Sequence, residues 1–402
     1  MNEKRTPKVL LISYQSGTLF WRAKNPLELL QDSRICELVT LSPEQIPFRD
    51  RYWMMQWDIV VFHQSWNDQC AILAQHFKTI GKRIVLSVDD LINWNKIPRF
   101  IEGAQPYSEV GFAHNIQLMM DLADRVVVTQ PFLLDQLAHF YEQPKSKFVV
   151  FPNLPSFGWL ARYFNPERKA KEFCGRKGKL RIGVISALTH YSIEGKKIPD
   201  DLDVVVEASS KLKELKHDGI TWVLPIGKSN CEITKRFPDG VNVETRDMCM
   251  IRNYPFMLDK LNLDLVVVPL MDNDFNKSKS NIKLLECSAM GIRFLVQNLY
   301  PYQGFCDEQD MFSDSDSLVS KIVEFIGWYE KRYLNCVKGN YKRFFENESD
   351  YYGHKLKTYW LENNTVLVGD TFLGRGFATD ANGIVPPDIK EEEENGKMEK
   401  GN

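Results

Sequence analysis

The chain has 402 residues, 44% of them hydrophobic, and a formal net charge of −2. This length suffices for two α/β domains with separate cores, and the near-neutral charge excludes a general attraction to nucleic acid or acidic membranes. No apolar run reaches membrane-spanning length, the N-terminal stretch enters a strand without a signal-peptide core, and the eight cysteines form no CxxC pair. These features favour a cytoplasmic protein with free thiols and no transmembrane segment.

The first half of the chain alternates between apolar runs and helical segments. Strand candidates are 8–13, 36–41, 58–63, 83–88, 125–129 and 147–152, and helices are expected near 70–80 and 116–123. Alternation at this spacing predicts a parallel sheet with helices on both faces.

The second half repeats this pattern. Its strand candidates are 180–186, 220–227, 241–245, 263–270 and 292–297, with a helix near 202–216. Two tandem Rossmann-like domains place a ligand in the cleft between them, at the carboxyl ends of the strands.

The segment 265–302 carries the strongest functional signal. A buried strand is followed by a polar, basic loop that includes Lys279, Ser280 and Asn281, and then by a helix that contains Lys283 and Glu286. A helix N-terminus has free N–H groups and a positive dipole end, and Ser280 or Asn281 can cap it. The loop therefore predicts a site for an anionic ligand, most simply a phosphorylated one.

This segment resembles the donor-binding block of family-4-like glycosyltransferases with the GT-B fold, in a bacterial and phage branch that carries the pattern FN-x-x-KSN-x-K-x-x-E. The matching residues are Phe275, Asn276, Lys279, Ser280, Asn281, Lys283 and Glu286. The wider family often has a second glutamate eight positions earlier, where this chain has Ser278. The resemblance implies a nucleotide diphosphate sugar donor, with Glu286 on the ribose.

The resemblance also implies how the chain is divided. We expect an N-terminal acceptor domain at 1–160, a basic linker at 161–179 and a nucleotide-sugar domain at 180–328. Helices at 329–365 would cross back to the first domain, and 366–402 would form an extension with a disordered acidic tail. The linker is interpreted either as a solvated connection or as a contact for a polyanionic acceptor.

The chemistry expected at this site needs no metal and no cofactor. Lys279 and Lys283 lie about one helical turn apart and would neutralise the leaving diphosphate together with the helix dipole. The alternative interpretation is that both lysines are ordinary surface charges. The resemblance implies transfer with retention of anomeric configuration.

Candidates for the catalytic and acceptor side come from other loops. Asp89 and Asp90 end a strand and would orient acceptor hydroxyls or act as a base, or else form a turn or helix cap. His190 would contact the donor, with a structural role as its alternative. Gly17 permits close backbone approach, and Arg22 would meet phosphate or acceptor unless it forms a surface ion pair.

The resemblance therefore implies a hexosyl- or pentosyltransferase, acting in the cytoplasm of a bacterial cell or a phage-infected host. Its acceptor would be a surface glycan, a lipid-linked saccharide or a hydroxymethylated base in phage DNA. A nucleotide-sugar epimerase and a non-catalytic scaffold of the same fold remain as alternatives, and the sequence does not fix the oligomeric state.

Overall fold

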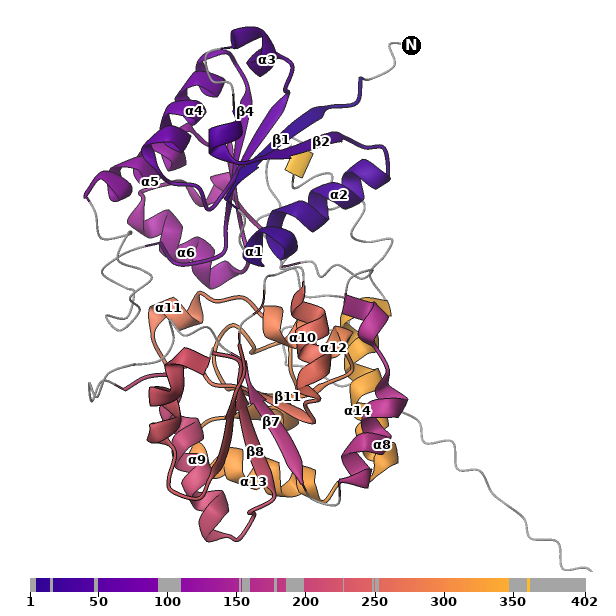
Figure 1. Cartoon of the computed structure of the whole chain (residues 1–402). Coiled ribbons are helices and arrows are strands. Elements are labelled where there is room, and N and C mark those ends of the chain that lie inside the picture. Colours follow the sequence, from indigo (N-terminus) through magenta and orange to yellow (C-terminus); the bar gives the residue numbers. More distant parts are fainter. Residues whose placement is uncertain are drawn as a thin grey trace, which may run out of the picture.

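The chain folds into two α/β domains, shown one above the other in the computed structural model of Figure 1. The structure describes residues 5–14, 17–46, 50–92, 110–151, 153, 160–176, 179–185, 199–226, 228–247, 249, 253–346 and 360–361. Within these ranges no helix is both long enough and apolar enough to cross a membrane.

The first domain is built on a six-stranded parallel sheet with the order β2-β1-β3-β4-β5-β6. Its strands are β1 (Lys8–Ser13), β2 (Glu37–Leu41), β3 (Ile59–His63), β4 (Arg83–Val88), β5 (Arg125–Val128) and β6 (Phe148–Val150). All five residues of β3 are buried, as expected where helices cover both faces of a parallel sheet.

Helices and one π-helical turn cover both faces of this sheet (Figure 1). They are α1 (Gly17–Leu19), the π-helix η1 (Phe20–Lys24), α2 (Asn25–Asp32), α3 (Arg51–Met55), α4 (Asp68–Thr79), α5 (Val110–Leu122) and α6 (Pro131–Phe140), with 3-10 turns η2 (Pro43–Gln45) and η5 (Lys145–Lys147).

The second domain has a six-stranded parallel sheet with the order β12-β11-β10-β7-β8-β9. Its strands are β7 (Leu180–Val184), β8 (Ile220–Leu224), β9 (Asn242–Thr245), β10 (Leu265–Val268), β11 (Arg293–Gln297) and β12 (Met311–Phe312). The two-residue β12 was not predicted, because so short a strand leaves no periodic signal.

The helices of the second domain again cover both sheet faces. They are α8 (Pro166–Gly175), α9 (Asp203–Glu214), α10 (Tyr254–Leu261), α11 (Asp274–Lys277), α12 (Ile282–Ala289), α13 (Ser315–Ile326) and α14 (Glu330–Tyr341), with the π-helix η11 (Lys342–Glu346) and 3-10 segments η6 (Ala161–Tyr163), η8 (Lys228–Arg236) and η10 (Glu308–Asp310).

Residues 360–361, which belong to the segment expected to cross back, lie against the first domain. Trp360 is fully buried in a core cluster with Val9, Leu11 and Phe151 of the first domain. The Arg83 guanidinium donates to the Leu361 carbonyl oxygen. The short yellow element inside the upper domain of Figure 1 is this segment.

The basic segment that precedes β7 contains helix α8, which packs beside α14 (Figure 1). Arg168 forms an ion pair with Asp259 at 2.5 Å, and Arg176 pairs with the buried Asp264. Lys169 is itself only 2% exposed. The described basic side chains of α8 are therefore largely engaged by acidic groups of the second domain, which favours a structural role over a polyanion contact.

Candidate active site

The predicted donor loop lies where the second domain meets the first. Asn276 is buried in α11, and its side-chain amide donates to Asp201 at 2.8 Å and to the Met271 carbonyl at 3.1 Å. Ser278 is fully buried and donates to the Asp274 carbonyl at 2.7 Å. These bonds fix the loop that leads to Asn281, the residue at the N-cap of α12.

Lys283 and Glu286 lie on one face of α12, and Tyr254 of α10, which was not predicted from the sequence, contacts both. The Lys283 ammonium lies 2.9 Å from Glu286 Oε2, and the Tyr254 hydroxyl donates to the same oxygen at 2.8 Å. Lys283 also lies 3.1 Å from the Tyr254 hydroxyl. Burial, and then the Glu286 charge, raise the pKa of Tyr254 well above its ordinary value.

Glu286 is only 3% exposed, so its carboxylate needs a compensating partner. We predicted that a ribose diol would fill this role. In the structure Lys283 and Tyr254 are the partners, and they hold the carboxylate in place beside the start of α12.

Lys279 bridges the two domains. Its ammonium lies 2.6 Å from Asp90 Oδ1 and 4.0 Å from the ring centroid of Phe275. Phe275 itself belongs to the core cluster of the first domain. Lys279 and Asp90, which were predicted separately for donor and acceptor, are thus brought together at the domain junction.

Two amides of the first domain hold the same loop. Gln130, which follows β5, donates to the carbonyl oxygens of Lys277 and Lys279, at 2.5 and 3.0 Å. Asn153, which follows β6, donates to the Ser280 hydroxyl at 2.7 Å. The carboxyl ends of β4, β5 and β6 therefore face the predicted phosphate loop, as expected for a ligand site in an α/β protein.

Asp89 is buried at the end of β4, beside Asp90. It accepts a hydrogen bond from the Gln64 side chain. Burial, and then the adjacent Asp90 charge, raise the pKa of Asp89 to about 7, against the opposing effect of Arg22. Gln64 has a positive φ of 44°, a backbone strain that non-glycine residues show mainly at functional or tightly constrained positions.

His63 ends β3 and was not proposed from the sequence. Its imidazole is fully buried, 3.2 Å from the Thr18 hydroxyl and 3.1 Å from the Ser87 hydroxyl. Burial, and then the Arg22 charge, lower the pKa of His63 to about 3. The ring is therefore neutral at physiological pH and links α1, β3 and β4 through hydroxyl groups.

Arg22 lies in the π-helix η1 and is fully buried, not a surface residue. One amino group donates to the Phe151 carbonyl, whereas Nε and Nη2 have no hydrogen-bond partner in the described part of the chain. Burial lowers the pKa of Arg22 to about 9. Gly17 begins α1, five residues before Arg22.

His190, the remaining predicted catalytic residue, lies outside the described residues. Within the described ranges, no group of three or more His, Cys, Asp or Glu side chains could hold a metal ion.

A pocket of about 440 Å³ opens at the carboxyl ends of β1 and β2. Its walls come from these two strands, from η1 and from the 3-10 turn η2. A volume of this size lies in the range of small-molecule sites.

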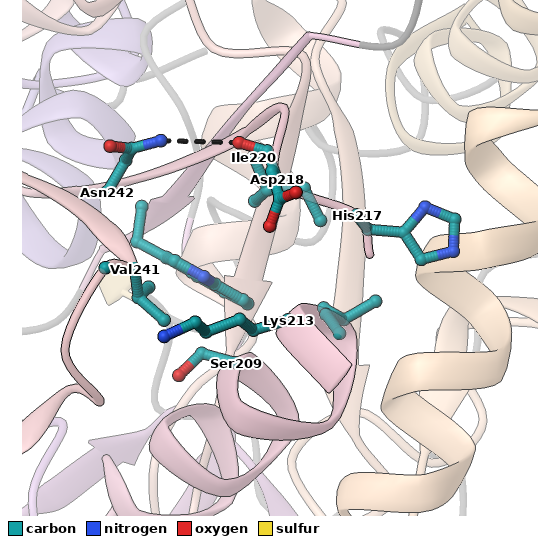
Figure 2. A pocket seen from close by; sticks show the side chains of 10 residues that line it. Ser209, Lys213, His217, Asp218, Ile220, Val241 and Asn242 are labelled. Carbon is teal, nitrogen blue, oxygen red and sulfur yellow. Dashed lines mark hydrogen bonds between the residues drawn. The ribbon is translucent and has the colours of Figure 1, made fainter. Parts of the chain in front are cut away.

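Figure 2 shows another hollow, at the start of β8 and β9 in the second domain. Lys213, His217 and Asn242 surround it, and the Asn242 amide donates to the Asp218 carbonyl at 3.3 Å. Its volume of about 20 Å³ holds roughly one water molecule. The hollow lies at the amino ends of the strands, away from the donor loop, so we assign no ligand to it.

Comparison with known proteins shows the fold. No protein-family model and no curated protein matches the sequence. The crystal structure of Anabaena Alr3699/HepE in complex with UDP matches 88% of this chain and 95% of its own, with 10% identity and a TM-score of 0.53. Its complex with UDP-glucose matches with 11% identity over the same shares and the same TM-score.

A glycosyltransferase from Rickettsia africae matches 88% of this chain and 99% of its own, with 15% identity and a TM-score of 0.49. The structural similarity to HepE confirms the predicted fold class. The chain has a GT-B-like architecture of two Rossmann-like domains.

Four residues of the site were not predicted from the sequence: Tyr254, His63, Gln64 and Gln130. They differ in whether their position in the sequence indicates a place at the ligand edge of a sheet. His63 and Gln64 end an apolar strand, and Gln130 follows another, so their placement at the ligand edge could have been inferred. Tyr254 begins a helix that is remote in sequence from Glu286, and only the tertiary structure brings the two together.

Proposed function

We propose that this protein is a family-4-like glycosyltransferase that moves a sugar from a nucleotide diphosphate sugar to an acceptor hydroxyl. The observation that carries the proposal is the junction at the start of α12. There a lysine-bearing loop meets the strand ends of the first domain, at Asp90, Gln130 and Asn153, and leads into the helix that carries the buried Glu286. The free N–H groups at the helix N-terminus, the positive end of the helix dipole and the lysines supply the hydrogen-bond donors and positive charge that a diphosphate requires.

The HepE structures support a uridine nucleotide as the first donor to test, because they hold UDP and UDP-glucose. In our proposal Glu286, steadied by Lys283 and Tyr254, receives the ribose hydroxyls. Ser280 and Asn281 offer hydroxyl and backbone groups to the phosphates at the N-terminal end of α12.

Lys279 and Lys283 would stabilise the negative charge that develops on the diphosphate as the glycosidic bond breaks. Lys279 pairs with Asp90 at 2.6 Å, so donor binding would transfer this ammonium from Asp90 to phosphate. Asp90 would then be free to orient the acceptor hydroxyl, next to Asp89. The transfer would retain the anomeric configuration and would use no metal, with the leaving phosphate taking the acceptor proton.

A saccharide acceptor is better supported than a base in DNA. The basic side chains of α8 that would make a polyanion contact pair instead with Asp259 and Asp264. DNA binding depends chiefly on unpaired lysines and arginines that neutralise phosphates. We therefore propose a glycan or lipid-linked saccharide as acceptor, and hydroxymethylated DNA is the outcome that would displace it.

A thermal-shift screen tests the donor site. The panel contains UDP, GDP, ADP, CMP and dTDP with their common sugar conjugates. A ligand that binds only the folded state stabilises it by about 2.7 kcal/mol at a hundredfold excess over Kd, so one diphosphate should raise Tm clearly. The absence of any shift would contradict the proposal. Conversion of the donor sugar into its epimer without acceptor would instead identify an epimerase.

A further inference from the structure

The pocket at the β1–β2 edge lies beside the candidate active site but not within it. Register pairs Ser13 of β1 with His63 of β3, and His63 with Ser87 of β4. Adjacent strands lie about 4.8 Å apart, so the pocket is roughly 10 Å or more from the end of β4. That separation exceeds the length of a single hexopyranose ring.

Helix α1 nevertheless connects the lining of the pocket to the cluster at His63. Leu19 lines the pocket, and its neighbour Thr18 places a hydroxyl 3.2 Å from His63 Nε2 and 3.4 Å from Gln64 Oε1. Two linked sugar rings are long enough to span the separation between the pocket and the end of β4, where Asp89 and Asp90 lie.

The lining combines apolar carbon with neutral hydrogen-bonding groups. The polar members are the hydroxyls of Ser13, Thr40 and Ser42 and the amide of Gln45, and the apolar members include Phe20 and Leu41. A sugar ring presents carbon-bound hydrogens on its faces and hydroxyls around its edge, and this lining complements both.

The charge around the pocket does not favour an anion. Among the described lining residues Lys24 is the one that carries a charge, and its ammonium lies 3.6 Å from the Glu28 carboxylate and 4.8 Å from the Phe20 ring centroid. Glu44 also hydrogen-bonds to the Ser42 side chain at the rim. Two carboxylates thus accompany one ammonium, whereas a phosphate or uronate site would need a positive excess.

We propose that this pocket is a second acceptor subsite that binds a neutral sugar residue, and that the acceptor is an oligosaccharide or glycan end of at least two units. The proposal rests on the transferase function proposed above and adds to it the length and charge class of the acceptor. The sugar in the pocket is the one remote from transfer, and the reacting hydroxyl belongs to the next residue along the glycan.

The test uses a printed array of neutral and acidic oligosaccharides, with duplex DNA as a separate probe. We expect the wild-type protein to bind neutral glycans of two or more units. The best of them is then titrated, beside its constituent monosaccharides, by saturation-transfer NMR. The disaccharide or longer glycan should bind at least tenfold more tightly than any single unit.

Two neighbouring residues of β2 provide a matched pair of variants. Thr40 lines the pocket and Val39 points to the opposite face of the strand, and both are exposed. Thr40→Trp should fill the pocket and weaken glycan binding at least tenfold, whereas Val39→Trp should change it less than twofold. Thr40→Val, which adds no bulk, should weaken it about fivefold through the lost hydroxyl.

Retained glycan binding in Thr40→Trp would overturn the proposal, and so would selection of acidic glycans or DNA, or no glycan binding at all. A nucleotide-induced thermal shift measured on the same proteins separates the two claims. A normal shift with failed glycan binding refutes the subsite alone, whereas an absent shift refutes the proposed transferase function.

Discussion

Asp89 lies buried at the end of β4 with a pKa of about 7, against an ordinary value of 3.8. The folded protein therefore holds a proton on Asp89 between about pH 4 and pH 7 that the unfolded chain has released. Stability must fall as pH rises through this window and become independent of Asp89 above it. Near neutrality Asp89 exists in both forms, which suits a group that positions a hydroxyl.

The first prediction concerns this proton. Asp89→Asn should flatten the decline in the free energy of unfolding between pH 4 and pH 7, which a single group can drive by at most about 1.4 kcal/mol per pH unit. Urea denaturation at several pH values measures it. Parallel pH profiles for the variant and the wild type would show that Asp89 is ionised in the fold. Asp124→Asn, at an exposed ion pair with Lys78, serves as the control.

The second prediction concerns the tyrosine that supports Glu286. Tyr254→Phe removes the hydroxyl that donates to Glu286 and contacts Lys283. It should lower the free energy of unfolding by about 1–3 kcal/mol, because a buried carboxylate loses a hydrogen bond. It should also weaken nucleotide binding. Tyr329→Phe, at a side chain that is 63% exposed, should change neither, and equal stability of both variants would exclude a supporting role for Tyr254.

Polar residues at strand ends are the part of the candidate site that the sequence makes easiest to find. The sequence pointed to Asp90 and Lys279 separately, and the structure joins them at 2.6 Å. It could not indicate that Arg22 is buried, because a charged side chain has no burial signature of its own in the sequence. Nor could it indicate that Glu286 already has protein partners, since Tyr254 is brought to it only by tertiary packing.

The connection from helix α12 to strand β11 depends on the turn that ends the helix. Gly291, two residues after the last residue of α12, has a φ of 66°, in the left-handed region that favours glycine. A Cβ there would lie 3.3 Å from the Phe164 ring. This turn sets the direction in which β11 leaves the helix that carries Lys283 and Glu286.

The third prediction follows from that geometry. Gly291→Ala should lower the free energy of unfolding by about 1–2 kcal/mol, since it adds backbone strain and a tight contact. Gly339→Ala lies within helix α14 and meets nothing within 4 Å. It should instead stabilise the protein by about 0.5–1 kcal/mol. Equal effects of the two substitutions, measured by urea denaturation, would refute the assigned role of Gly291.

In the whole molecule, residues 360–361 from the C-terminal part of the chain complete a core cluster of the first domain. Trp360 is fully buried and its ring lies 6.3 Å from that of Phe151. The fourth prediction is that Trp360→Ala costs about 3–5 kcal/mol and speeds hydrogen exchange in β1 and β6 of the first domain. Exchange that accelerates in the second domain alone would contradict this anchoring.

The two sheets were predicted from apolar runs, and 11 of the 12 strands in the described part of the chain fall within the predicted segments. Buried parallel strands are continuous apolar runs and therefore easy to find. The order of strands within each sheet, and the contact of Phe275 with the core of the first domain, depend on packing between distant segments. No local pattern specifies them, so they emerge only with the structure.

Calorimetric titration of the nucleoside diphosphate selected by the thermal-shift panel, with UDP tested first, addresses the central claim most directly. Lys277 ends α11, two residues before Lys279, and its ammonium pairs with Asp272 of the second domain at 2.5 Å. Lys279→Ala and Glu286→Ala should weaken nucleotide binding at least about tenfold, through the loss of a charge-assisted or buried hydrogen bond. Lys277→Ala should bind like the wild type. Wild-type affinity in Lys279→Ala and Glu286→Ala, or no nucleotide binding by the wild type, would contradict the account.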